Sequence, residues 1–184
     1  RVKSLQDVGA HALNTYPGTW RKEGGSKTEG NIIDEEYKEG IYVGYRWADR
    51  KKQRPVFAFG HGLSYTQFAI SNLRADKASM TAADSITFTV QVKNIGQRAG
   101  SETVQLYVHD AKASVDRPLK ELKGFSKVSL QPGESKDVSI TLGKDALSFY
   151  DEASATWKAE AGQFEAWVGN ASDNLKLKKT FELK

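Results

Sequence analysis

The sequence contains no cysteine, so structural disulfides and thiolate metal sites are excluded. It has no apolar run near the roughly 18 residues that a membrane-spanning helix needs, and no leader-like basic and apolar segment stands at its start. Its three histidines, His11, His61 and His109, are far apart and share no motif, whereas a metal site needs ligands that come together. We therefore expect no membrane span, no metal and no cofactor.

The sequence also lacks a concentrated block of charge. The 27 basic and 23 acidic residues give a formal net charge of +4, and the longest basic run is Arg50-Lys51-Lys52. Proteins that bind nucleic acids normally gather their basic residues on one face. We therefore expect no nucleic-acid partner.

What the sequence does contain, from residue 67 onward, is a series of short alternating segments. Ile86, Phe88, Val90 and Val92 alternate strictly with polar residues, which is typical of a strand with one buried face. Seven or eight such segments follow one another, with turn residues roughly every 8–12 positions. This spacing predicts a mainly β fold, an antiparallel β-sandwich of the immunoglobulin or fibronectin type III kind, over residues 67–184.

Residues 1–66 show a different character. The segment around Trp20 is polar and rich in glycine, and long irregular loops are uncommon inside a compact domain. Further on, Ile41, Val43, Tyr45 and Trp47 alternate, which favours an extended strand. We therefore predict that residues 1–66 are mostly loop and extended chain and form a part separate from the sandwich.

The stretch from residue 55 to residue 68 links the two parts. Its large apolar side chains, among them Phe57, Phe59 and Tyr65, surround the closely spaced Gly60 and Gly62. Aromatic side chains bury large areas, and glycine permits backbone conformations that other residues avoid. The composition predicts a buried junction.

Three motifs in this first part carry a resemblance to a known family. They are Tyr16-Pro17-Gly18, residues 37–47 (YKEGIYVGYRW) and residues 57–68 (FAFGHGLSYTQF). In this order the motifs resemble the C-terminal part of glycoside hydrolase family 3, which includes β-glucosidases and β-xylosidases. The strands downstream, for example residues 103–108 (TVQLYV) and 147–151 (LSFYD), are similar to the fibronectin type III-like domain of many members.

The resemblance implies that this chain belongs to a longer enzyme whose catalytic residues lie in other domains. Family members carry a (β/α)8 barrel with the nucleophilic aspartate, then an α/β sandwich with the acid/base glutamate, then the fibronectin-like domain. On this basis residues 1–66 are the tail of the α/β domain, and the chain holds no catalytic residue. The parent would hydrolyse β-linked glycosides with retention, the partners of this chain would be the upstream catalytic domains, and a periplasmic or secreted location is implied.

Two residues stand out as candidates for contact with substrate. Trp20 lies in a polar loop without a local core, and His61 lies between two glycines in an aromatic setting. Trp157 and Trp167 fall in strands and are expected in the sandwich core. The acidic run Asp34-Glu35-Glu36 is interpreted as a solvated loop rather than as the carboxylate pair that glycoside hydrolysis requires.

Two other functions are open to a chain of this kind. A stand-alone carbohydrate-binding sandwich would need an exposed aromatic row, for which Trp20, Trp157 and Tyr107 are the available residues. An adhesion or scaffold domain would instead show a large apolar patch used for assembly.

Overall fold

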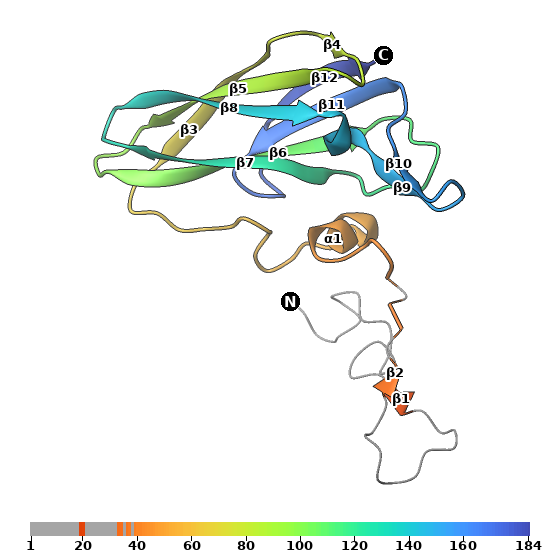
Figure 1. Cartoon of the computed structure of the whole chain (residues 1–184). Coiled ribbons are helices and arrows are strands. Elements are labelled where there is room, and N and C mark those ends of the chain that lie inside the picture. Colours follow the sequence, from red (N-terminus) through yellow and green to blue (C-terminus); the bar gives the residue numbers. More distant parts are fainter. Residues whose placement is uncertain (1–18, 21–32, 35, 38) are drawn as a thin grey trace. The chain divides into compact units, whose positions relative to one another are not determined.

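The computed structural model describes residues 19–20, 33–34, 36–37 and 39–184. The chain divides into two compact units, Arg1–Ala58 and Phe59–Lys184. Each unit is described by itself below, beginning with the second, which contains the predicted strands (Figure 1).

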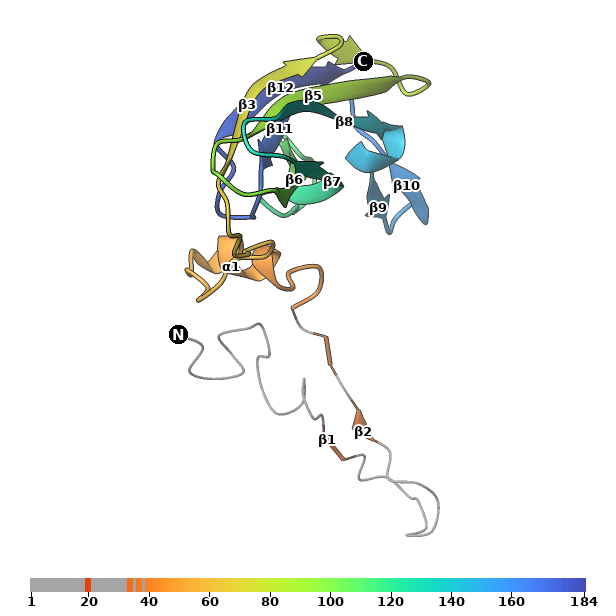
Figure 2. The ribbon, with the colours of Figure 1, turned by 90° about the vertical axis from the view of Figure 1, so that its left-hand side faces the viewer.

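The second unit is a sandwich of two sheets (Figures 1 and 2). One sheet has three antiparallel strands in the order β3 (Phe68–Ala75), β5 (Ser85–Asn94) and β8 (Ser135–Gly143). The other has five strands in the order β4 (Ser79–Met80), β12 (Leu177–Leu183), β11 (Gly162–Gly169), β6 (Gly100–Asp110) and β7 (Glu121–Leu130). Only the β4–β12 pairing is parallel among these strands. The prediction of a mainly β sandwich is confirmed.

The core lies between the two sheets and follows the alternation of the sequence. The four apolar positions of β5, from Ile86 to Val92, are at most 2% exposed. Phe181 of β12 contacts Phe88 edge-on at 5.2 Å between ring centroids and stacks on Phe164 of β11 at 5.7 Å. Each such buried side chain contributes about 1.5–3 kcal/mol, so the sandwich is held together without disulfides.

A two-stranded ribbon extends the sandwich after strand β8. The chain passes through the 3₁₀ turn η2 (Lys144–Leu147) into β9 (Phe149–Asp151), which pairs with β10 (Thr156–Lys158). Trp157 lies on this ribbon and is 67% exposed, so the prediction that it belongs to the core is wrong. Trp167 was also expected in the core, but it is half-buried on the outer side of the five-stranded sheet, between His109 and Lys178.

Within its described residues, the first unit contains two short strands that pair, β1 (Thr19–Trp20) and β2 (Ile33–Asp34), and one helix, α1 (Tyr45–Lys51). The helix corrects the prediction of an extended strand over residues 41–47. Gly44 adopts φ 63°, which stops the extended chain, and its carbonyl accepts the amide of Ala48 at 3.1 Å. The residues that follow, from Ala48 to Lys51, include good helix formers, and the helix buries Trp47. No described helix is long and apolar enough to span a membrane.

Candidate functional site

The segment before β3, residues 59–67, is fastened to the sandwich by its backbone. At one end, the amide of Ser172 donates to the carbonyl oxygen of Phe59 at 2.8 Å. Gly60 follows with φ 88°, and a Cβ at this position would lie 2.1 Å from Nε2 of Gln105 and 3.0 Å from the carbonyl oxygen of Asn170. A residue with a side chain would therefore be strained and would collide with β6.

The other end of the segment is held by a buried asparagine. The hydroxyl of Thr66 donates to Oδ1 of Asn94 at 2.7 Å, and Asn94 Nδ2 donates to the carbonyl of Leu130 at 3.1 Å. The amide of Ile95 also donates to the carbonyl of Gln67 at 2.8 Å. Residues 59–67 are thus fixed to both sheets, because Asn94 ends β5 and Leu130 ends β7.

Between these anchors the large side chains are exposed to solvent. Phe59 is 53% exposed, Leu63 is 96% exposed and Tyr65 is 92% exposed. The prediction of a buried junction is therefore wrong for this chain by itself. The backbone is ordered by the sandwich, while these apolar side chains are more than half exposed, which is typical of a surface that contacts another body.

The same surface continues onto strand β7. Phe125 is 70% exposed and lies opposite Gln105 in the β6–β7 ladder, and opposed residues share one face of a sheet. Gly60 lies against the side chain of Gln105, so Phe125 and the segment are on the same outer face of the five-stranded sheet. We call Phe59, Leu63, Tyr65 and Phe125 the docking face.

The structure describes the two predicted contact residues to different extents. His61 is exposed on the segment that carries the docking face. Trp20 forms part of β1, and its side chain lies outside the described part of the structure. Whether either residue contacts a sugar stays a prediction. The sequence analysis did not single out Phe125. Side chains alternate between the two faces of a strand, and Phe125 is five residues before the buried Leu130 at the end of β7. This spacing is a signal that Phe125 faces outward.

Carboxylates of the described sandwich are engaged in structural pairs. Arg117 donates to Asp110 at 3.1 Å and to Glu121 at 3.3 Å, and the guanidinium also donates to the carbonyl of Leu147 at 3.0 Å. The side chains of these three ion-paired residues are 7–12% exposed. Among residues 39–184, no group of three or more His, Asp or Glu side chains could hold a metal ion. These carboxylates are neutralised by Arg117 and serve the fold.

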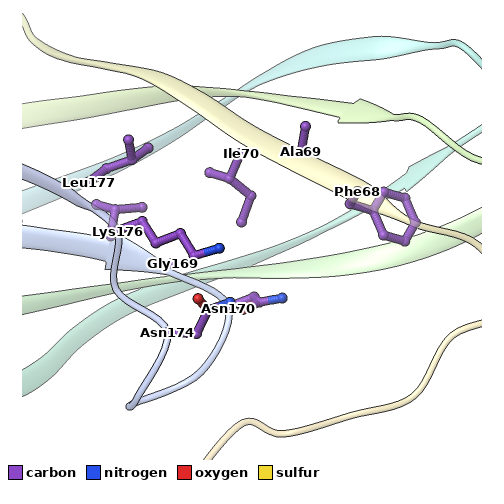
Figure 3. Close-up of a pocket in the computed structure, with 9 residues that line it drawn as sticks. Phe68, Ala69, Ile70, Gly169, Asn170, Asn174, Lys176 and Leu177 are labelled. Atoms are coloured by element: carbon purple, nitrogen blue, oxygen red, sulfur yellow. Dashed lines mark hydrogen bonds between the residues drawn. The ribbon is translucent and has the colours of Figure 1, made fainter.

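A depression of about 270 Å³ opens beside β3 and the β11–β12 connection. Figure 3 shows Asn170, Asn174 and Lys176 on one side of it and Phe68 and Ile70 on the other. Its lining includes no carboxylate, whereas a retaining glycosidase needs two carboxyl groups about 5–5.5 Å apart. This pocket therefore does not have the chemistry of a hydrolytic site.

Comparisons with known proteins agree with this geometry. Residues 102–172 match the fibronectin type III-like domain. The chain is 47% identical over 180 residues to a β-glucosidase of Bacteroides ovatus and 50% identical over 145 residues to thermostable β-glucosidase B of Acetivibrio thermocellus. These alignments cover 97% and 79% of this chain, but 22% and 19% of the relatives. The chain is homologous to the C-terminal region of family 3 β-glucosidases.

Solved structures of the family have the same fold as this C-terminal region. The crystal structure of a family 3 β-glucosidase from Bifidobacterium adolescentis matches with a TM-score of 0.81 and 34% identity, over 97% of this chain and 24% of that one. DesR, a β-glucosidase from Streptomyces venezuelae in complex with D-glucose, matches with a TM-score of 0.82 and 34% identity, over 96% of this chain and 21% of that one. This chain thus spans about a fifth of the length of the relatives and solved structures that it matches.

Proposed function

We propose that this chain is the non-catalytic C-terminal portion of a β-glucosidase-like family 3 enzyme, and that it braces the catalytic domains of the same polypeptide. The parent enzyme would hydrolyse β-glycosidic bonds with retention, using carboxylates that lie upstream of these residues. In this position the segment that carries His61 could shape the substrate entrance. The relatives' activity and the glucose bound to DesR support a β-glucoside as the parent's substrate.

The observation that carries the proposal is the docking face. Three apolar side chains that are more than half exposed lie on a segment whose two ends are hydrogen-bonded to the sandwich. Leaving such side chains in water is unfavourable, and burying them against another domain contributes about 25 cal/mol per Å² of apolar area. The first unit also exposes large apolar side chains, including Tyr37, Val43 and Phe57, as expected for a region that packs against further domains.

A chimera tests this proposal. The 184-residue chain replaces the matching C-terminal segment of the Bacteroides ovatus β-glucosidase, to which it is 47% identical. We expect the chimera to hydrolyse a chromogenic β-glucoside, the truncated relative to lose most of its activity, and the 184-residue chain alone to show no turnover. Clear turnover by the chain alone would overturn the non-catalytic assignment.

The role of the docking face is tested in the same chimera with paired variants. Leu63→Asp introduces a charge on the docking face, and Val115→Asp introduces one at an exposed aliphatic residue on the β6–β7 connection. We expect Leu63→Asp to reduce chimera activity or its melting temperature strongly and Val115→Asp to leave both nearly unchanged. Equal effects of the two variants would contradict docking through this face.

A further inference from the structure

The β9–β10 ribbon places two aromatic side chains together on its outward face. Trp157 lies directly opposite Tyr150, whereas Lys158 lies opposite Phe149. Because side chains alternate between the two faces of a strand, Tyr150 and Trp157 share the face that Phe149 does not use. Phe149 lies under the guanidinium of Arg117 at 5.7 Å, so its face is directed to the sandwich. Tyr150 and Trp157 are accordingly 51% and 67% exposed.

Hydrogen bonds hold the ribbon in place at both of its ends, before β9 and after β10. Arg117 donates to the carbonyl of Leu147, two residues before β9. After β10, the hydroxyl and the amide of Ser114 donate to the two carboxylate oxygens of Glu160 at 2.5 and 3.1 Å. The aromatic pair is therefore presented on a fixed support, which lowers the entropy cost of binding.

The two rings are arranged edge to face, with centroids 5.8 Å apart and planes at 74°. In this geometry the ring faces are not stacked on one another, so each ring keeps a face available to a ligand. Next to the pair, Glu152 in the β9–β10 turn is exposed, whereas Thr156 and Lys158 lie on the opposite face of the ribbon with Phe149. The site therefore combines two flat apolar surfaces with the Tyr150 hydroxyl, the Trp157 indole N–H and the carboxylate of Glu152.

We propose that the Tyr150–Trp157 pair is a binding platform for β-linked gluco-oligosaccharides. A β-glucopyranosyl ring carries its hydroxyls equatorially, so both of its faces present C–H groups that can stack on an aromatic ring. The hydroxyls at its edge can bond to the Tyr150 hydroxyl, the Trp157 indole N–H and the Glu152 carboxylate, because tyrosine and tryptophan each combine an apolar ring with a polar group.

A protein partner fits this site less well than a sugar does. Stable protein interfaces bury about 1,200–2,000 Å² and have an apolar centre, whereas this site has two aromatic side chains beside one exposed carboxylate, Glu152. The docking face, by contrast, carries four large apolar side chains. The platform is thus independent of the bracing role, and one proposal can fail without the other.

The test is a titration of the 184-residue chain with cellopentaose, followed by calorimetry and by the indole N–H signal of Trp157 in NMR spectra. We expect saturable binding at millimolar concentrations with a shift of the Trp157 signal. Trp157→Ala should weaken binding roughly tenfold, equivalent to about 1.4 kcal/mol, and Trp157→Phe should lose less. Phe125→Ala, which removes an exposed ring of the docking face, should bind as the unmodified chain does.

Three outcomes would overturn the proposal: no saturable binding of cellopentaose, binding that Trp157→Ala leaves unchanged, or equal affinity for α-linked maltopentaose. If the 184-residue chain does not bind cellopentaose but Trp157→Ala lowers the activity of the chimera, the Tyr150–Trp157 pair contacts another protein domain instead of a sugar. Circular dichroism checks that each variant is folded. Should Trp157→Ala fail to fold, the affinities of Trp157→Phe and Tyr150→Ala decide the question.

Discussion

Gly60 lies directly against the side chain of Gln105, so closely that a Cβ on the glycine would come within 2.1 Å of Nε2. Gln105 cannot easily move away, because it is 5% exposed and its Oε1 accepts the hydroxyl of Tyr107 at 2.7 Å. The anchor of the segment at Phe59 therefore requires a residue without a side chain at position 60.

The variant Gly60→Ala is expected to destabilise the protein by about 1–3 kcal/mol, because it adds strain at φ 88° to the collision with Gln105. Urea denaturation measures the difference. Gly62→Ala is the matched control, since a Cβ there would have no heavy atom within 4 Å, and its effect should stay within about 0.5 kcal/mol. Equal effects of the two variants would show that the contact with Gln105 does not limit the segment.

Removing the guanidinium of Arg117 is expected to cost about 3–5 kcal/mol, because Asp110 and Glu121 would be left as poorly compensated buried charges. Lys123 also contacts Glu121, at 2.5 Å, and softens the loss at that carboxylate. Arg117→Ala should be compared with Arg74→Ala by chemical denaturation. Arg74 pairs with Asp137 at the surface, where both side chains are more than half exposed, and such pairs are worth about 0–1 kcal/mol. Similar losses in the two variants would contradict a buried network.

Asn94→Ala is expected to destabilise the sandwich by about 2–4 kcal/mol. Asn94 is fully buried and donates to the carbonyls of Arg98 and Leu130, and each buried group left without its partner costs about 1–3 kcal/mol. Thr66→Ala removes one bond to the same residue and should cost about 1 kcal/mol. Thermal unfolding of the two variants measures both effects, and a loss in Asn94→Ala no larger than in Thr66→Ala would disprove the central role of Asn94.

The attachment of the ribbon should weaken in acid. The hydrogen bonds from the Ser114 hydroxyl and amide, in this order of importance, lower the pKa of Glu160. A carboxyl whose pKa is lower in the folded state stabilises the fold above its unfolded pKa, about 4.3 for glutamate, and this contribution disappears as the pH falls through the folded pKa. Ser114→Ala should raise the pKa of Glu160 toward its ordinary value, as measured by NMR titration; an unchanged pKa would contradict this account.

The sandwich could be predicted from the sequence because its strands alternate strictly and its turns are regularly spaced. The alternation of apolar and polar residues from Ile86 to Val92 is enough to identify the buried face of strand β5. Helix α1 could not be predicted in the same way. It is seven residues long, and its two aromatic residues, Tyr45 and Trp47, continue by chance the alternation of Ile41 and Val43.

The exposed aromatic side chains were the hardest feature to predict. An apolar composition indicates that a stretch is buried, but it does not say which body covers it. The composition of residues 55–68 therefore predicts a buried junction between the two parts of this chain. Trp157 was assigned to the core because it follows a strand pattern. Its exposure depends on Phe149 facing Arg117, a contact between positions 32 residues apart that no local pattern reveals.

The hydrogen bond between Ser172 and Phe59 joins positions that are 113 residues apart. On the ribosome, residues are added from the N-terminus onward, at about 5–20 per second. The segment that carries Phe59, Leu63 and Tyr65 therefore has to wait for several seconds of translation before the turn that fixes it exists. During that interval the hydrogen bond between Ser172 and Phe59 cannot form, so the end of the segment near Phe59 is not yet anchored to the sandwich.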